Sequence, residues 1–270
     1  MSMRLAAHRG FSEFYPENTL LAYHEALKLD IDMLEIDLHM TKDGEIVMIH
    51  DHTVDRTTNG KGLVRDMTLL EIRQLDAGSW MGEQFRGLKV PTFREFLEMM
   101  KDYPDMEVNV ELKDYPHHSG QFALDSCDKI LAMLEEYNMT DRIYINTWSG
   151  ELGQYIYNKH GKRYRLHGYY PMFLNSGEFD RETYYEKMFC VCLFNRTQNP
   201  DGSINRLPDP LMQPEDYKYI ASLGIEPWAC FTPTPERLQK AHEMGVVGFT
   251  VNDSKLAGQI LNDLEIRKFK

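Results

Sequence analysis

With 270 residues, the chain is long enough to bury the core of one large α/β domain, and α/β barrels often reach this size without dividing into two domains. The formal net charge of −12 and the pI near 5.3 argue against a sequence-independent grip on nucleic acid or on an anionic membrane surface, because such a grip needs clustered lysine and arginine. Arg4 already belongs to the first predicted strand and no apolar stretch approaches ~20 residues, so we expect no signal peptide, no stable membrane insertion and a cytoplasmic location.

Strand-like and helix-like segments alternate from the N-terminus. The apolar run at residues 4–7 ends in His8-Arg9-Gly10, as a buried strand does when it opens into a loop. The turn Pro16-Glu17-Asn18-Thr19 precedes a helical pattern over residues 20–27. Residues 33–50 predict a β-hairpin, because strict polar and apolar alternation is followed by an Asp-Gly turn and a second apolar run.

Residues 51–90 interrupt this rhythm, and we interpret them as a small inserted subdomain with one short helix near residues 68–75. From residue 92 the alternation resumes, with helices predicted at 93–100, 124–137, 150–160, 214–222 and 235–243 and strands at 107–112, 142–146, 165–170, 188–194, 225–230 and 246–251. Eight principal strands, each followed by a helix, indicate a TIM (β/α)8 barrel that forms a single domain over residues 1–270, with insertion 51–90 after the second strand. Asn199-Pro200-Asp201-Gly202 predicts only a long polar loop.

Charged side chains recur where the predicted strands end. Because side chains alternate between the two faces of a strand, Glu35 and Asp37 project the same way, roughly 7 Å apart along the chain. Asn109, Glu111 and Lys113 share a face for the same reason. Functional groups of a TIM barrel sit at the C-terminal ends of its strands, so we expect these side chains to converge.

The converging groups suit the cleavage of a phosphate diester. Three carboxylates that face one point favour a hard divalent cation, Mg²⁺ or Ca²⁺, over zinc, and fixed cations beside it match the charge that builds on the phosphate oxygens. The unperturbed pKa of histidine lies close enough to neutrality for one ring to accept a proton and another to donate one. We therefore predict His8 and His50 as the acid/base pair, Arg9 and Lys113 as phosphate contacts, and Glu35, Asp37 and Glu111 as the metal ligands.

The order and spacing of short motifs across about residues 4–113 resemble the glycerophosphodiester phosphodiesterases. The matching motifs are His8-Arg9-Gly10, Pro16-Glu17-Asn18-Thr19, Glu35-x-Asp37, Thr41-Lys42-Asp43-Gly44, His50-Asp51, Arg56-Thr57-Thr58-x-Gly60, Pro91-Thr92 and Glu111-x-Lys113. The resemblance implies a metal-dependent hydrolysis that gives glycerol 3-phosphate and an alcohol. It also implies that the neighbouring hydroxyl of the glycerol attacks phosphorus through a cyclic intermediate.

The C-terminal half departs from this family pattern. The seventh strand of the family typically ends in a Trp-Thr-x-Asn type motif, whereas this chain reads Pro227-Trp228-Ala229-Cys230 and continues with changed polar residues. We predict that Trp228 forms a hydrophobic wall for the glycerol moiety. The departure leaves the alcohol part of the substrate open, and nothing in the sequence sets the oligomeric state.

Two other functions compete with hydrolysis of a small glycerophosphodiester. A phospholipase D-like enzyme for lysophospholipids would need an apolar ring at the barrel mouth, for which Trp80, Phe85, Phe173 and Phe231 are the candidates. A non-catalytic barrel that binds glycerophosphodiesters would not need two histidines for proton transfer.

The remaining reactive residues are assigned milder roles. We expect His39 to form a hydrogen bond or lie at the rim, His167 to contact substrate, and His52, His117 and His118 to be exposed to solvent. The four cysteines, Cys127, Cys190, Cys192 and Cys230, show neither disulfide-rich nor zinc-binding spacing, and we expect reduced thiols.

Overall fold

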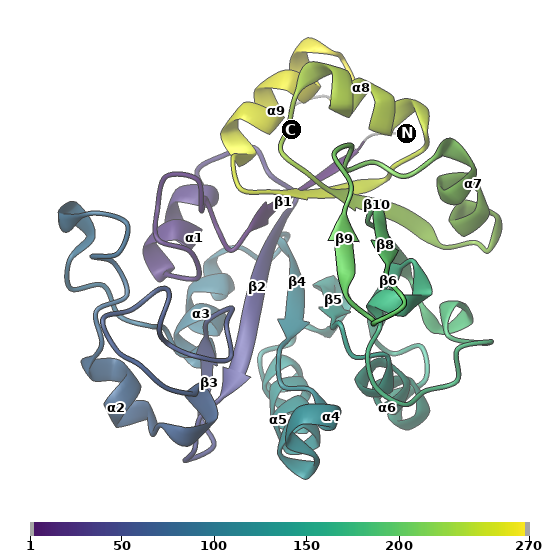
Figure 1. The fold of residues 1–270 in the computed structure, drawn as a ribbon. Helices are drawn as coiled ribbons and strands as arrows, with labels where there is room; N and C mark the ends of the chain where they lie inside the picture. Colours follow the sequence, from purple (N-terminus) through teal and green to yellow (C-terminus); the bar gives the residue numbers. More distant parts are fainter. Residues whose placement is uncertain (1–2, 268–270) are drawn as a thin grey trace.

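The computed structural model describes residues 3–267, in which eight parallel strands close into a barrel (Figure 1). The first strand pairs with both the second and the last, and this double pairing closes the cylinder. The barrel strands are β1 (Arg4–His8), β2 (Met33–Met40), β4 (Glu107–Leu112), β5 (Ile143–Asn146), β6 (Arg165–Tyr170), β7 (Cys190–Leu193), β10 (Glu226–Cys230) and β11 (Gly248–Val251). The predicted TIM barrel is confirmed.

Helices surround the strands (Figure 1). Most of them begin at a residue whose side chain caps the first turn. Thr92 accepts a hydrogen bond from the backbone N–H of Glu95, whose carboxylate accepts from Thr92 in return; Thr19, Ser149, Thr234 and Asp253 cap four other helices. The outer helices are α1 (Leu20–Ala26), α3 (Phe93–Met99), α5 (Gln121–Glu136), α6 (Gly150–His160), α7 (Pro214–Ser222), α8 (Pro235–Glu243) and α9 (Ser254–Asp263), with the short α4 (Pro116–Ser119) before α5. None of the helices within residues 3–267 has the length and apolarity to cross a membrane.

Large side chains fill the barrel interior near the end at which the strands begin. Trp228 is 1% exposed, and its ring lies 5.3 Å from the ring of Tyr144, centroid to centroid. Arg4, at the start of β1, stacks over the Trp228 indole at 5.3 Å. Gly248 on the neighbouring strand leaves room for this ring, because a Cβ there would lie 2.6 Å from the indole. The barrel is therefore plugged at its N-terminal end and can be open only at the other.

The strand β3 (Ile46–Met48) pairs antiparallel with β2, which confirms the predicted hairpin. Residues 51–90 follow it and contain the 3₁₀ turns η1 (Val64–Asp66) and η2 (Glu83–Phe85) and the helix α2 (Leu69–Gln74). This segment shares a small apolar core with β3 and the residue that follows it, formed by Val47, Ile49, Val54, Val64, Ile72, Ala77 and Val90. Its side chains reach back to the barrel through ion pairs described below.

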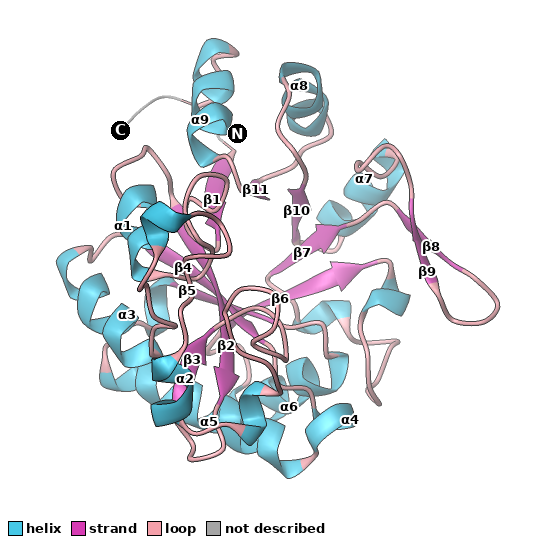
Figure 2. Cartoon of the chain, turned by 60° about the vertical axis from the view of Figure 1, so that its left-hand side comes forward, coloured by secondary structure: helices cyan, strands magenta, loops and turns pink. Residues whose placement is uncertain are grey.

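A second hairpin stands where the sequence predicted only a polar loop. The strands β8 (Arg196–Gln198) and β9 (Ile204–Arg206) pair antiparallel, with Arg196 opposite Arg206 at the base. Figure 2 shows the hairpin projecting beyond the end of the barrel to which β6 and β7 point. Asn199–Gly202 form the polar turn between the two strands, as their sequence indicated. The flanking strands were not predicted, because both are short and exposed and therefore carry no apolar alternation.

Candidate active site

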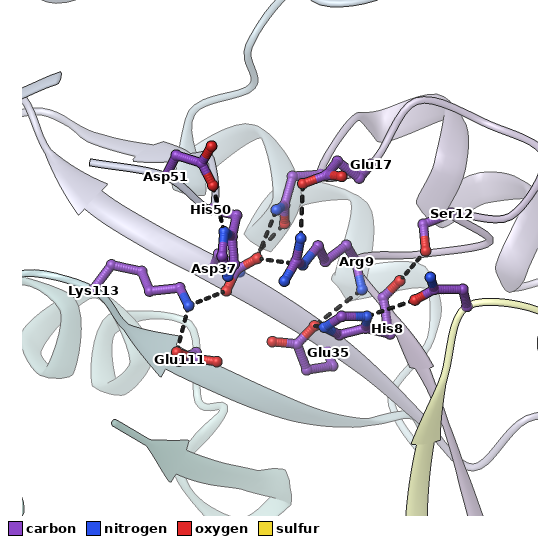
Figure 3. A network of polar contacts seen from close by, with 12 residues as sticks. His8, Arg9, Ser12, Glu17, Glu35, Asp37, His50, Asp51, Glu111 and Lys113 are labelled. Atoms are coloured by element: carbon purple, nitrogen blue, oxygen red, sulfur yellow. Dashed lines mark hydrogen bonds and ion pairs between the residues drawn. The ribbon is translucent and has the colours of Figure 1, made fainter. Parts of the chain in front are cut away.

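The register of the barrel strands places the predicted site residues side by side. His8 pairs with Glu35 across β1 and β2, and Glu35 pairs with Asn109 while Asp37 pairs with Glu111 across β2 and β4. One carboxylate oxygen from each of the three acids lies within 4.8 Å of the others. All three acids are at most 6% exposed. Figure 3 shows their carboxylates turned toward one another at the ends of these strands.

The loop after β1 folds tightly over this cluster. Arg9 and Gly10 have positive φ angles of 56° and 84°, and a Cβ on Gly10 would lie 2.7 Å from the backbone of Ala22. The turn directs the backbone N–H of Arg9 to the side-chain oxygen Oε2 of Glu35 at 3.0 Å. The loop therefore fixes one carboxylate by its main chain.

Asn18, in the motif Pro16-Glu17-Asn18-Thr19, contacts one carboxylate of the site, a role the sequence did not reveal. It also has a positive φ, of 56°, and its amide donates a 2.8 Å hydrogen bond to Oδ2 of Asp37. The hydroxyl of Tyr23 donates to the Asn18 carbonyl oxygen at 2.6 Å, which fixes the amide orientation. The motif thus orients the central carboxylate rather than merely capping a helix.

Two cations flank the central carboxylate. Asp37 lies 3.1 Å from Nε of Arg9 and 3.1 Å from Nζ of Lys113, and Lys113 also pairs with Glu111 (Figure 3). Burial pushes the pKa of Asp37 upward, but Lys113 and Arg9 outweigh it and hold that pKa well below its usual range. Burial, and then the charges of Asp37 and Glu111, raise the pKa of Glu35 well above its ordinary value.

The donor set fits a hard cation. Three buried carboxylates face the buried Lys113 and the partly buried Arg9, and both Oε1 of Glu35 and Oδ1 of Asn146 are buried without a hydrogen bond. Such oxygens are the ligands that Mg²⁺ and Ca²⁺ prefer, and no cysteine lies in the cluster. Glu35, Asp37 and Glu111 are the residues that could hold the ion.

The two predicted catalytic histidines lie on either side of the carboxylates. Nδ1 of His8 lies 2.6 Å from Oδ1 of Asn252, and Nδ1 of His50 lies 2.6 Å from a carboxylate oxygen of Asp51. Burial lowers the pKa of His8 to about 4, with a further contribution from Arg9, and burial also lowers the pKa of His50. With an oxygen acceptor at Nδ1, each neutral ring keeps its proton there and leaves the Nε2 lone pair free.

Salt bridges tie His50 to the rest of the site. Arg56 lies in the segment after β3, and its guanidinium pairs with Asp51 at 2.8 Å and with Glu17 at 2.7 Å. Glu17 in turn pairs with Arg9 at 2.9 Å. This chain of charges holds the segment at residues 51–90 against the mouth of the barrel and positions the partner of His50.

The site opens into a cavity of about 460 Å³, called the active-site cavity below. Its wall includes His8, Arg9, Glu35, His50 and Glu111. The other side is formed by residues that were not predicted as site residues, namely Asn146, Trp148, Tyr169, Phe194, Asn195, Arg196, Arg206, Leu207 and Pro210. His167 also lines the cavity and is 4% exposed, and its contact with substrate stays a prediction.

The predicted aromatic wall was assigned to the wrong tryptophan. Trp228 lies deep in the barrel and is absent from the cavity wall, because its position on β10 faces inward near the plugged end. Trp148 does line the cavity, and it stacks on Tyr169 with ring centroids 3.7 Å apart. Trp148 lies two residues after the end of β5, so its position after a barrel strand could have identified it.

The remaining histidines, the cysteines and the four aromatics with predicted roles lie outside the carboxylate cluster. His39 is buried, with Nδ1 2.8 Å from Asp114, which confirms the hydrogen-bonding role. His52, His117 and His118 are exposed, and all four cysteines are free thiols, as expected. Of the four aromatics proposed for an apolar ring, none lines the active-site cavity within the described chain; Phe231 is buried against Phe249 instead.

Known proteins resemble this chain in both sequence and fold. The model of the Glycerophosphoryl diester phosphodiesterase family matches residues 8–264. A glycerophosphodiester phosphodiesterase of Caldanaerobacter subterraneus subsp. tengcongensis is 43% identical over 150 residues, which cover 55% of this chain and 59% of that protein. A glycerophosphodiester phosphodiesterase of Bacillus subtilis is 40% identical over 142 residues, which cover 49% of this chain and 46% of that protein. The chain thus aligns with only about half the length of these curated relatives.

Solved structures show the same fold at lower sequence identity. A phosphodiesterase of Oleispira antarctica, in complex with the product sn-glycerol-3-phosphate, superimposes with a TM-score of 0.79 at 21% identity and covers 97% of both chains. A glycerophosphodiester phosphodiesterase of Agrobacterium tumefaciens gives a TM-score of 0.72 at 22% identity, covering 95% of this chain and 99% of that one. Since the family model extends over nearly the whole chain, the chain belongs to the glycerophosphoryl diester phosphodiesterase family.

Proposed function

We propose that this chain hydrolyses glycerophosphodiesters to sn-glycerol 3-phosphate and an alcohol, with Mg²⁺ or Ca²⁺ bound by Glu35, Asp37 and Glu111. The observation that carries the proposal is the convergence of three carboxylates, two cations and two histidines at one cavity. Family membership and the activity in the names of the relatives support the reaction type. A cytoplasmic location and a small-molecule substrate are part of the same proposal.

Positive charge at the phosphate is the first requirement of the reaction. When bound, the divalent cation would supply charge to the non-bridging oxygens of the diester. Arg9 and Lys113 are held at Asp37 at 3.1 Å and add fixed charge that needs no rearrangement during the reaction. Their guanidinium and ammonium groups orient the phosphate against the two histidines.

Proton transfer is assigned to the two histidines. One Nε2 accepts the proton of the attacking glycerol hydroxyl as a new P–O bond forms, and the other ring, protonated, donates to the oxygen of the departing alcohol as the old P–O bond breaks. A water molecule then opens the cyclic phosphate with the two roles reversed. The lowered pKa values of His8 and His50 favour the neutral ring that accepts a proton. The negative charge of the bound diester would favour the protonated ring that donates one.

The alternative functions have less support. A lysophospholipid enzyme was predicted to gather Trp80, Phe85, Phe173 and Phe231 at the mouth, and the active-site cavity contains none of them. A purely binding role leaves unexplained why both histidine rings are oriented through Nδ1 by oxygen acceptors. Hydrolysis accounts for both features of the site.

The test is release of glycerol 3-phosphate from a panel of glycerophosphodiesters and lysophospholipids with Mg²⁺, Ca²⁺ or EDTA. We expect metal-dependent release that EDTA abolishes, and a loss of about 10²–10⁴-fold in kcat for His50→Ala and for His8→Ala, the range that proton transfer contributes. His24→Ala is the matched control, because His24 is exposed on α1. Unchanged turnover in His8→Ala and His50→Ala would contradict the proposal.

A further inference from the structure

A second group of positive charge lies in the active-site cavity. Arg196 and Arg206 face each other across the base of the β8–β9 hairpin, and both line the cavity. The hairpin follows β7, which stands four strands away from β2 in the eight-stranded ring. The two arginines therefore rise from the side of the barrel opposite the strand that carries Glu35 and Asp37.

Neither arginine has an acidic partner among residues 3–267. Two arginines without an ion pair are unexpected here, because the chain has 42 acidic and 30 basic residues. The acids of the same segment are engaged elsewhere: Asp209 pairs with Lys240 at 2.8 Å, and Asp201 accepts hydrogen bonds from Ser203. Burial lowers the pKa of Arg196, and the like charge of Arg206 lowers it further. An anion bound between the two guanidinium groups would remove that repulsion.

The aromatic wall positions one of these guanidinium groups. Cζ of Arg196 lies 4.6 Å from the ring centroid of Phe194 and 5.4 Å from that of Trp148. Exposed aromatic faces would suit a quaternary ammonium group such as choline, but here a protein cation already covers them. Stacking also restricts the Arg196 rotamers, so less freedom is lost when the guanidinium binds a ligand.

We propose that Arg196 and Arg206 bind the alcohol portion of the substrate and select glycerophosphodiesters whose alcohol carries a phosphate group of its own. The inference rests on the proposed function. In the proposed function, Arg9, Lys113 and a cation held by the three carboxylates would bind the diester phosphate on the β1, β2 and β4 side, which leaves the second pair of arginines for another anion. Guanidinium groups match phosphate oxygens through paired hydrogen bonds.

The experiment compares kcat/KM for three substrates that differ in the charge of the alcohol: glycerophosphoinositol 4-phosphate, glycerophosphoglycerol and glycerophosphocholine. We expect the unmodified protein to prefer the first. Arg206→Ala should lower the ratio of kcat/KM for glycerophosphoinositol 4-phosphate to kcat/KM for glycerophosphocholine about tenfold, mostly through KM. A charge-assisted contact supplies roughly that factor. Arg206→Glu should invert the preference. Arg206 is exposed, so both changes avoid the packing of the barrel.

The control removes the same charge from the other end of the barrel. Arg163 precedes β6, is exposed, and stacks over Tyr164 at 5.9 Å, much as Arg196 stacks on its aromatics. Arg163→Ala should leave the substrate ratio unchanged. Arg196→Ala should repeat the selective loss seen for Arg206→Ala.

A binding measurement separates this inference from the proposed function. Inositol 4-phosphate, the alcohol product of the first substrate, should bind in calorimetry in the presence of EDTA, about tenfold more weakly to Arg206→Ala. Equal losses for all three substrates, or binding that Arg206→Ala leaves unchanged, would overturn the subsite while hydrolysis stood. Retained binding without turnover of any glycerophosphodiester would support the subsite and contradict the proposed function.

Discussion

Individual backbone positions hold the loop after β1 in place, and Gly10 is the clearest case. Its φ is 84°, and an added Cβ would meet the Ala22 backbone at 2.7 Å. We expect Gly10→Ala to lower the free energy of unfolding by about 2–5 kcal/mol, because a left-handed backbone costs roughly 1–2 kcal/mol and an overpacked contact roughly 1–3 kcal/mol more. Urea unfolding followed by fluorescence measures this.

Gly44 provides the control for that substitution. Its φ is 83°, yet nothing lies within 4 Å of the added Cβ. Gly44→Ala should therefore show only the backbone cost of about 1–2 kcal/mol. Equal losses in the two variants would mean that the contact with Ala22 relaxes freely.

Side-chain identity and strand alternation correctly predicted that the charged residues converge, but they did not indicate how deep in the barrel an inward-facing residue lies. Glu35, Asp37 and Glu111 converge because alternation fixes the face and parallel pairing fixes the height. Trp228 obeys the same alternation and faces inward, yet it sits near the plugged end. Which layer an inward residue occupies depends on the stagger between strands, and one strand's sequence does not contain that information.

At the scale of elements, Asp114 connects β2, β4 and α5. It lies two residues after the end of β4 and accepts hydrogen bonds from the Met40 backbone at 2.8 Å and the Ser126 hydroxyl at 2.7 Å. It also lies 2.8 Å from Nδ1 of His39. Burial raises the pKa of Asp114, but these bonds outweigh it and hold that pKa below its ordinary value. The ionised carboxylate is therefore the form that the fold stabilises.

That depressed pKa sets the pH dependence of an Asp114→Asn variant. The stabilisation by the ionised Asp114 is complete above the pKa of this carboxyl in the unfolded chain, about 4. It is lost as the pH falls through the lower pKa of the folded protein. We expect the variant to be less stable by about 2–3 kcal/mol at pH 7, with the difference shrinking below about pH 4. Unfolding curves at several pH values test this, with exposed Asp125→Asn on α5 as the control. A difference that does not change with pH would contradict the argument.

The elements that sequence patterns revealed are those with a buried face. Strands of the barrel and their covering helices carry runs of apolar residues because both faces of the sheet are covered. The β8–β9 hairpin buries little, so Arg196-Thr197-Gln198 and Ile204-Asn205-Arg206 look like loop sequence. The hairpin side of the active-site cavity was missed for this reason, while the convergence of the charged residues on β1, β2 and β4 was predicted.

At the scale of the whole molecule, the metal site couples the charge of the cluster to the stability of the barrel. When Glu35 is ionised and no cation is bound, the three carboxylates exceed Arg9 and Lys113 in charge, and burial together with the repulsion from Asp37 and Glu111 raises the pKa of Glu35. Buried charge without compensation destabilises a fold, whereas a ligand that binds only the folded state stabilises it. The site therefore has opposite effects on stability with and without its ion.

Glu35→Gln should consequently reverse its effect on stability when metal is added. In EDTA we expect the variant to melt at a higher temperature than the unmodified protein, by about 2–4 °C for each 1 kcal/mol of repulsion removed, because Oε1 of Glu35 is buried without a hydrogen bond. At a Mg²⁺ or Ca²⁺ concentration one hundred times Kd the unmodified protein gains about 2.7 kcal/mol, a gain that the variant largely loses. Differential scanning fluorimetry over a metal titration measures both effects, with exposed Glu243→Gln on α8 as the control. If Glu35→Gln and the unmodified protein responded equally to the metal, Glu35 would not be a ligand, and the ion would have to be held by Asp37 and Glu111 without it.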